Sequence, residues 1–406
     1  CMYEFSLSGL ITLVMTSIVP PVVIPREASV KTVMQWSCLM WGAASLLGCG
    51  EASSALEQTG ASSALATLSQ AETTNPWRTT APMQLERASM SPVPLNSGLV
   101  LFAGGHVRNA PYQTTTSELY NPFSNTWQST GGLNRERVQG AIVKLDSGKV
   151  LWAGGTNSGG MTADAELYDP DTGTWSWTGR LLMRRWEHDA TLLNSGKVLI
   201  TGGDVIRKNE SGYDVQEGAR SAELYDPATG TFSFGGNVGH DTYSSAPARL
   251  YSGEVLLVSG NTQRVVLYNP DTNSWREAAP IPTLRRGYSS TDLFTVTRLY
   301  SGSVLVVGGP KVDVYDPYND RWTSAAPMNY PREKHTATLL FSGKVLVTGG
   351  DVAQSEVYDP STNTWTVVGN IPNPARGASA SLLHTGQVLV FGAQFDFRTT
   401  ASVFTP

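Results

Sequence analysis

Short apolar runs alternate with turn-forming residues along most of the chain. The clearest unit reads SGKVLVTGGDVAQSEVYDPSTNTW at residues 342–365, and near copies stand at 195–232 and 147–175. The run after Ser-Gly is almost continuously apolar, as in a strand buried on both faces, and a second apolar run ends at Asp-Pro. Two more strands complete the unit. The first is a short run before it, such as residues 188–193, and the last is a run that begins at Trp or Phe. Each unit therefore predicts a four-stranded antiparallel sheet joined by tight turns.

The unit occurs seven times, at intervals of about 48 residues, which is a spacing typical of propeller blades. A Ser-Gly or Thr-Gly pair precedes each buried run, and a double glycine or a degenerate form of it follows. The double-glycine positions are residues 104–105, 154–155, 202–203, 259–260, 308–309, 349–350 and 392–393. The sequence thus predicts an all-β fold, a seven-bladed β-propeller over residues 73–406.

Closure of the predicted ring depends on the two ends of the repeat region. Six third strands end at Tyr and are followed by Trp or Phe, but the last unit has Phe404 in the Tyr place and stops at Pro406. The missing fourth strand has a counterpart at residues 73–77, TTNPW, which is similar to PSTNTW at 360–365. We therefore expect Trp77 to lie in an N-terminal outer strand that completes the seventh blade.

The paired glycines, followed by Tyr and then Trp, resemble the kelch repeat, and the resemblance covers about residues 74–406. Closure by an N-terminal outer strand is similar to the seven-bladed domain of galactose oxidase. The resemblance implies that these glycines and aromatic residues build the blades and do not carry chemistry.

The N-terminal part has a different pattern, which predicts a signal segment over residues 1–49. Arg26 and Lys31 precede an apolar run at 33–48 that ends in small residues. Leu46-Leu47-Gly48-Cys49 resembles the lipobox of bacterial lipoproteins, which implies cleavage before Cys49 and acylation of its sulfur. The alternative is an ordinary secretory signal or a membrane anchor that contains a cysteine. Gly50 follows, in place of the Asp that retains many lipoproteins at the inner membrane, so we expect a protein of the outer membrane or cell surface.

Residues 1–25 have two interpretations. The chain begins with Cys, so this stretch is either translated sequence upstream of a start near Met34 or Val30, or a membrane-spanning segment at 5–24 that contains two prolines. Residues 50–72 are rich in Ala and Ser and predict a polar tether, with a helix as the alternative.

The formal net charge of −5 argues against a general nucleic-acid binder, because such proteins need a basic surface. The three cysteines all lie at or before residue 49, so the predicted propeller has no disulfide and no thiolate metal site. The Tyr–Cys crosslink of galactose oxidase cannot form there, and the five histidines show no metal-ligand spacing. We predict no metal and no cofactor. His384 is expected in a hairpin on the face opposite the predicted ligand site.

Two sets of loops share one face of the predicted ring: those that lead into the first strands and those that follow the double glycines. Six of the seven units have an arginine in the former, and the long loops 106–118 and 204–220 belong to the latter. Arginine with aromatic residues favours planar or anionic partners. The alternative is that these arginines pair with a carboxylate or the backbone of a neighbouring blade. The candidate ligand-binding residues are Arg87, Arg137, Arg185, Trp186, His188, Tyr243, Arg286, Tyr288, Arg332, His335 and Arg376.

The sequence therefore predicts an exported, monomeric, lipid-anchored binding module. Its ligand is a surface glycan or protein, with an anionic glycan favoured by the arginines, held at the mouth of the ring. The alternative is a glycan-active enzyme with a mutarotase-like or oxidase-like site at the same mouth. Its acid and base would come from Glu187, His188, His240 and Asp241.

Overall fold

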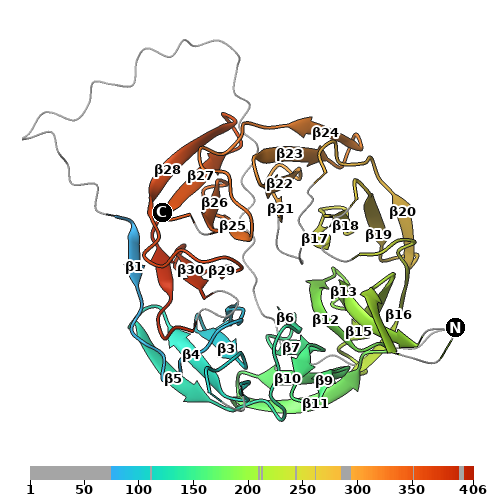
Figure 1. Cartoon of the computed structure of the whole chain (residues 1–406), viewed down its shortest axis with the longest axis vertical. Coiled ribbons are helices and arrows are strands. Elements are labelled where there is room, and N and C mark those ends of the chain that lie inside the picture. Colours follow the sequence, from blue (N-terminus) through green and yellow to red (C-terminus); the bar gives the residue numbers. More distant parts are fainter. Residues whose placement is uncertain are drawn as a thin grey trace, which may run out of the picture. The chain divides into compact units, whose positions relative to one another are not determined.

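The computed structural model describes residues 75–406 except 110–111, 209–210, 212–213, 243–244, 261, 285–293, 351 and 393–396. All the elements of this described part are strands, and all but β8 and β9 form a ring of seven antiparallel sheets, each with its first strand at the centre (Figure 1). This confirms the predicted seven-bladed propeller. The expected signal segment, tether and Cys49 lie outside the described residues.

The blades are numbered here in chain order. Blade 1 contains β2 (Val93–Pro94), β3 (Val100–Ala103), β4 (Ser117–Asn121) and β5 (Thr126–Thr130). Blade 2 contains β6 (Ala141–Lys144), β7 (Val150–Ala153), β10 (Asp164–Asp169) and β11 (Thr174–Arg180), with a small hairpin of β8 (Thr156–Asn157) and β9 (Gly160–Met161). Blade 3 contains β12 (Arg185–Leu192), β13 (Val198–Lys208), β15 (Ser221–Asp226) and β16 (Thr231–Asn237), and β14 (Asp214–Gly218) pairs with the end of β13.

The later blades follow the same order. Blade 4 contains β17 (Ser245–Arg249), β18 (Val255–Ser259), β19 (Val265–Asn269) and β20 (Ser274–Glu277). Blade 5 contains β21 (Thr295–Arg298), β22 (Val304–Gly308), β23 (Lys311–Asp316) and β24 (Arg321–Ser324). Blade 6 contains β25 (His335–Leu339), β26 (Val345–Gly349), β27 (Gln354–Asp359) and β28 (Thr364–Asn370). Blade 7 contains β29 (Ser379–Leu382), β30 (Val388–Phe391), β31 (Ser402–Phe404) and β1 (Trp77–Thr79).

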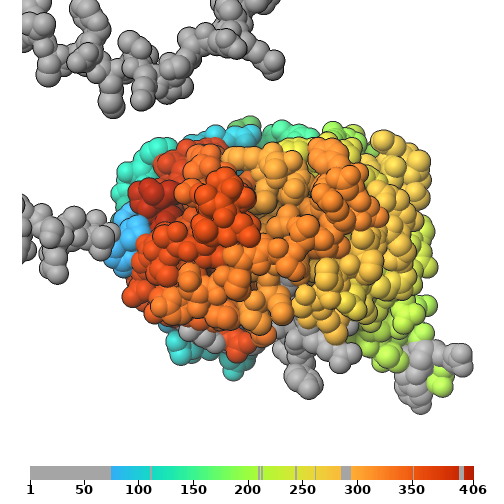
Figure 2. Space-filling view, turned by 90° about the horizontal axis from the view of Figure 1, so that it is seen from above, coloured from blue at the N-terminus to red at the C-terminus, as the bar shows by residue number. Residues whose placement is uncertain are grey.

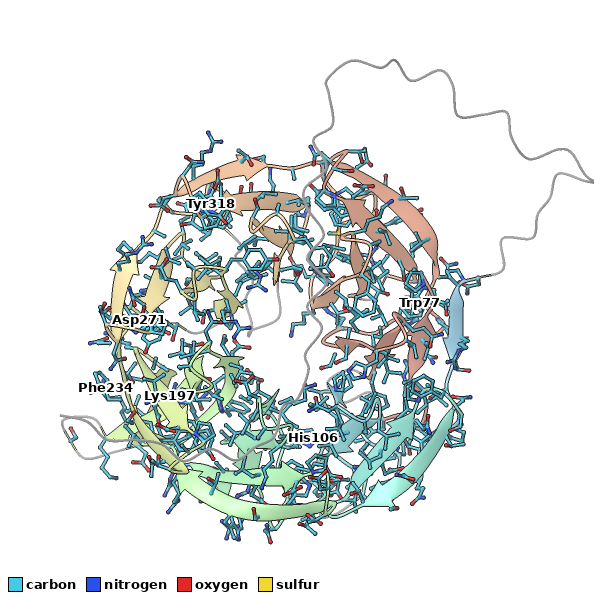
Figure 3. All side chains as sticks on the ribbon, turned by 180° about the vertical axis from the view of Figure 1, so that it is seen from behind. Trp77, His106, Lys197, Phe234, Asp271 and Tyr318 are labelled. Carbon is cyan, nitrogen blue, oxygen red and sulfur yellow. The ribbon has the colours of Figure 1, made fainter. Side chains whose placement is uncertain are left out.

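The ring closes through an N-terminal strand, as the sequence predicts. Strand β1 pairs antiparallel with β31, with Trp77 opposite Phe404 and Thr79 opposite Ser402. The two aromatic rings lie 5.2 Å apart between centroids. Trp77 is buried on the outer strand of blade 7 (Figure 3). The two ends of the described part of the chain therefore share one sheet.

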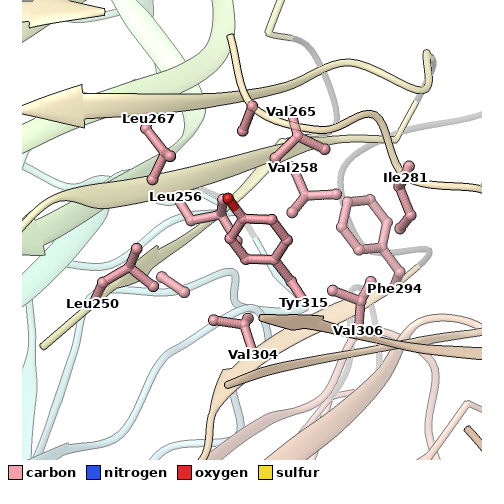
Figure 4. Packing of buried hydrophobic residues seen from close by; sticks show 12 residues of the cluster. Leu250, Leu256, Val258, Val265, Leu267, Ile281, Phe294, Val304, Val306 and Tyr315 are labelled. Atoms are coloured by element: carbon pink, nitrogen blue, oxygen red, sulfur yellow. The ribbon is translucent and has the colours of Figure 1, made fainter. Parts of the chain in front are cut away.

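The hydrophobic core lies between blades rather than inside one sheet. In six blades the second strand is buried along its whole length, as its continuous apolar pattern predicts, and in blade 3 only the last three residues of β13 are less buried. Between blades 4 and 5, Leu256 and Val258 of β18 pack against Val304 and Val306 of β22 (Figure 4). Equivalent clusters fill the other six interfaces, and Figure 2 shows neighbouring blades packed side by side along the rim. Each blade thus depends on both neighbours for its buried surface.

The double glycines hold adjacent blades together at their inner ends. In blades 1, 2, 5 and 6 the second residue of the pair donates its N–H to a carbonyl at the start of the next blade, as in Gly155 to Arg185 (2.9 Å) and Gly350 to Ala375 (2.9 Å). Gly155 has a φ of 96°, and a Cβ there would lie 2.4 Å from the carbonyl oxygen of Val138. Only glycine fits so close an approach at this angle.

Each blade's third and fourth strands carry a pair of aromatic rings in tilted contact, as Tyr358 and Trp365 do at 5.0 Å between centroids. The indole Nε1 of Trp365 also donates to the carbonyl oxygen of Ala326 in the connection from blade 5 (2.8 Å). These residues build blades, as the resemblance implies. Within the described residues, no helix is long and apolar enough to cross a membrane.

Candidate functional site

Four of the predicted ligand-binding arginines are buried in ion pairs inside the blades. Their side chains are 0% exposed, and each donates to a glutamate on the third strand of its own blade. The Nη2–Oε1 distances are 2.5 Å for Arg87–Glu118, 2.5 Å for Arg137–Glu166, 2.9 Å for Arg185–Glu223 and 3.0 Å for Arg332–Glu356. Burial lowers the pKa of each arginine, and the charge of its glutamate opposes that shift.

These pairs hold each first strand to the second and third strands of its blade. In blade 6, Arg332 Nη1 donates to the carbonyl oxygen of Gly349 (3.2 Å), and the backbone N–H groups of Asn329 and Tyr330 donate to Glu356 (2.8 and 3.0 Å). The expectation that Arg87, Arg137, Arg185 and Arg332 face a ligand is therefore wrong, because their guanidinium groups have no contact with solvent. The alternative prediction, that these arginines form structural ion pairs, is confirmed, but each pairs with a glutamate of its own blade and not of a neighbouring blade.

Blades 4 and 7 replace both members of this pair. Thr242 and Val266 stand in the arginine and glutamate positions of blade 4, and Ala375 and Ser402 stand there in blade 7. The Gly350–Ala375 hydrogen bond shows that Ala375, not Arg376, occupies the arginine position. Arg376 lies one residue further on and is exposed. Arg286, Tyr243 and Tyr288 lie outside the described residues, so their role in binding stays a prediction.

The residue two positions after each arginine adopts a left-handed backbone at the mouth of the ring. The φ angles are 58° at Ser89, 57° at Gln139, 51° at Glu187 and 53° at Lys334, and Gly377 takes the same place in blade 7 with 68°. Residues other than glycine rarely adopt such angles, and such strain concentrates at binding sites. These residues were not predicted from the sequence, although each stands two positions after an arginine of the repeat and could have been found from that spacing.

The left-handed residues surround one end of a central cavity of about 830 Å³ between the first strands. Its lining is mainly small and polar, including Ser91, Thr191, Ser245, Thr295 and Ser379. The charged residues in it are unevenly placed. Glu187 and Asp189 lie toward the mouth just described, whereas Arg249 and Arg298 end their strands at the opposite mouth. We call the first end the loop face and the second the hairpin face.

The histidines predicted to lie at the loop face are buried in it. His188 is 6% exposed, and burial, assisted by the charge of Arg185, lowers its pKa to about 3. His335 is buried too, with Nε2 3.1 Å from the hydroxyl of Thr295. Burial also lowers the pKa of His240. A ring that stays neutral and enclosed is a poor general acid or base near pH 7. No group of three metal-binding side chains occurs in the described residues.

The longest hairpin of the loop face, β13–β14, carries a polar cluster at its base. Trp186 is half-buried and donates from Nε1 to Asp204 Oδ2 (3.2 Å), and Gln216 Nε2 donates to the same oxygen (2.7 Å). Burial raises the pKa of Asp204, and the two hydrogen bonds partly oppose the rise. Among the predicted candidates, Trp186 thus lies on the loop face, oriented by an aspartate that sequence reasoning overlooked.

The comparisons with known proteins agree with this architecture. No protein-family model matches the chain. Mouse (Mus musculus) "Kelch-like protein 35" is 29% identical over 147 residues, covering 34% of this chain and 24% of that protein, so the match spans about a quarter of the relative. A solved structure described as "Novel fungal alcohol oxidase with catalytic diversity among the AA5 family, in complex with copper" matches with a TM-score of 0.65. That match covers 81% of this chain and 76% of the other at 15% identity, and it bears on the fold alone. The chain is thus a seven-bladed β-propeller, and part of it is similar in sequence to a kelch-like protein.

Proposed function

We propose that this protein is an exported, lipid-anchored binding module that holds a surface glycan or protein at the loop face of its propeller. The observation that carries the proposal is the central cavity of about 830 Å³, ringed at that face by residues in left-handed conformations. A closed ring with a core in every blade interface is a rigid scaffold, and rigid scaffolds suit binding by the loops they present.

The chemistry of the loop-face mouth favours a ligand rich in hydroxyl groups. Ser89, Gln139, Glu187 and Asp189 present both donors and acceptors, and Gln139 Nε2 already donates to Glu187 Oε1 (3.0 Å). Four of the arginines are enclosed in the blades and paired with glutamates, so they do not supply the positive charge that was expected at this face. We therefore propose a polyhydroxylated glycan as the first candidate ligand of the loop face, and a protein loop of similar polarity as the second.

Substitutions at this mouth test the proposal. The purified protein would be screened on a glycan array, and the affinity for each hit would be measured by calorimetry. Glu187→Gln with Asp189→Asn is expected to weaken binding about tenfold, which corresponds to the loss of about 1.4 kcal/mol. Asp271→Asn on the outer rim (Figure 3) serves as the matched control. Unchanged affinity in the double variant would remove the loop face from consideration.

A glycan-active enzyme at the same mouth is the second candidate, and the raised pKa of Asp204 is the observation that favours it. In that case a bound glycan would be converted to a new anomer or product, and Asp204→Asn would abolish the conversion while leaving the fold intact. Recovery of the unaltered glycan after long incubation would exclude this candidate for that glycan.

A further inference from the structure

A ring of side chains surrounds the hairpin face, which the proposed loop-face site does not use. The residue before each Ser-Gly or Thr-Gly turn extends over the turn glycine of the next blade. A Cβ on Gly302 would lie 3.3 Å from the ring of Tyr251, one on Gly343 would lie 3.3 Å from Tyr300, and one on Gly386 would lie 3.4 Å from Phe341. The same relation continues around the ring, through His384 to Gly98 and through Asn194 to Gly253.

The chemistry of this ring changes halfway around the molecule. Blades 1, 2 and 3 present Asn96, Asp146 and Asn194, but blades 4 to 7 present Tyr251, Tyr300, Phe341 and His384. The first three aromatic side chains of the second half are 52%, 53% and 61% exposed. Two further aromatic residues lie on the same face, in turns between third and fourth strands: Tyr318 is beside Gly302, and Phe123 is beside Gly98.

We call these six residues the aromatic arc. Each of these side chains lies within 4 Å of the place that a Cβ on a turn glycine would take, and each remains exposed to solvent. Buried aromatic pairs elsewhere in the protein build the blades, but nothing in the packing requires aromatic residues at these turns, since Asn and Asp serve the same place in blades 1 to 3.

Two arginines lie between the aromatic arc and the central cavity. Arg249 ends β17 and Arg298 ends β21, each two residues before an aromatic of the arc. Arg298 lies over the ring of Tyr251, 4.2 Å from its centroid, and donates from Nη1 to the carbonyl oxygen of Arg249 (2.7 Å). Both line the cavity. Neither has a carboxylate partner within the described part of the chain, whereas most arginines there form salt bridges.

We propose that the hairpin face binds an acidic polysaccharide, with sugar rings stacked on the aromatic arc and a uronic-acid carboxylate held by Arg249 and Arg298. The C–H faces of sugar rings pack on aromatic rings by dispersion, and arginine offers paired donors that match a carboxylate. In blades 4 to 7 the residue before the turn is aromatic once per blade, as Tyr251, Tyr300, Phe341 and His384. That spacing suits a repeating chain better than a protein surface, whose binding core is a contiguous apolar patch.

The test measures affinity for three uronic-acid polysaccharides, namely polygalacturonate, alginate and hyaluronate, and for their carboxyl-reduced or methyl-esterified forms. At least one acidic polymer is expected to bind at least tenfold more tightly than its neutral form, with an advantage that falls as salt is added. Tyr300→Ala and Phe341→Ala are each expected to weaken binding about fivefold or more. Arg249→Gln with Arg298→Gln is expected to remove the preference for the acidic form.

Matched controls separate this surface from others. Phe234→Ala removes an aromatic on the outer strand of blade 3 that is also exposed (Figure 3), and Asn194→Ala alters the polar half of the ring. Both are expected to bind as the unaltered protein does, and melting temperatures show that all variants fold. Failure of all three polymers to bind overturns the proposal, as does an equal loss in Phe234→Ala. The proposal is also overturned if the protein binds no polymer but self-associates, and Tyr300→Ala abolishes that self-association. The hairpin face would then bind a second copy of the protein. Loss in Glu187→Gln alone would assign the polymer to the loop face instead.

Discussion

Four arginine residues illustrate how one side chain can be assigned opposite roles from sequence and from structure. Each stands in a loop that leads into a first strand, which is where a ligand-binding arginine is expected. Each is instead enclosed and paired with a glutamate on the third strand of its blade. The signal was present in the repeats, because Glu118, Glu166, Glu223 and Glu356 occur in the blades that have the arginine, and Val266 replaces glutamate in blade 4 where the arginine is missing.

Breaking one buried pair should destabilise the fold strongly. Glu356→Val alone is expected to lower the free energy of unfolding by about 3–5 kcal/mol, because it leaves the Arg332 charge buried without a partner. Arg332→Thr with Glu356→Val reproduces the residues of blade 4, so the double variant is expected to lose less than the sum of the two single variants. Chemical denaturation measures all three.

The exposed pair Lys344–Asp359 is the control for this prediction. Its removal by Lys344→Gln is expected to change the free energy of unfolding far less than Glu356→Val does, because exposed ion pairs contribute little. Strictly additive losses at Arg332 and Glu356 would show that the two charges do not act as a pair.

His188 should make stability depend on pH. Its pKa is about 3 in the folded protein and near the ordinary value of 6.5 in the unfolded chain. Between these values the unfolded state binds more protons, so His188 removes stability as the pH falls from 6.5 toward 3, by at most about 1.4 kcal/mol per pH unit. His188→Ala, which places the residue of blade 7 in blade 3, is expected to flatten this part of the pH profile. Unfolding curves at pH 7, 6, 5 and 4 compare the variant with the unaltered protein, and parallel profiles would contradict the assigned pKa.

The strands were predictable because their pattern repeats. Residues 195–232 and 342–365 place an apolar run, a double glycine and a Tyr followed by Phe or Trp in the same order, and each of these has one physical role in a blade. The outer strand β1 was predictable as well, since TTNPW supplies the aromatic anchor that the last blade lacks. Side-chain direction in the connecting loops was not predictable in this way, because it depends on left-handed residues such as Gln139 and Glu187.

The closing strand predicts a large effect of Trp77. Trp77→Ala removes an aromatic side chain that packs on Phe404 and on the core between blades 6 and 7, so it is expected to cost about 3–5 kcal/mol. Phe234→Ala, on an outer strand and exposed, is expected to cost far less. Thermal unfolding measures both, and a melting temperature unchanged by Trp77→Ala would mean that β1 does not close the ring.

At the scale of the whole molecule, the two faces of the propeller offer different chemistry. The loop face combines a polar mouth with Glu187 and Asp189, and the hairpin face combines exposed aromatics with Arg249 and Arg298. The proposed binding at the loop face relies on the cavity, and the proposed binding at the hairpin face relies on the aromatic arc. Each proposal can therefore be disproved without the other.

The predicted anchor is tested by one substitution. Cys49→Ala is expected to release the protein from the membrane fraction or to block its processing, because acylation needs the thiol. Fractionation followed by mass spectrometry detects the change, with Cys38→Ala as the matched control. An unmodified peptide that spans Gly48 and Cys49 in the mature protein would contradict lipid anchoring.

The central claim is that this seven-bladed propeller binds a ligand and does not transform it. The most direct measurement is calorimetric titration of the purified protein with glycans found on an array, followed by chemical analysis of the recovered glycan. The account predicts saturable binding that is weakened by Glu187→Gln with Asp189→Asn, and recovery of an unchanged glycan. Conversion of the glycan during the titration, abolished by Asp204→Asn, would contradict it.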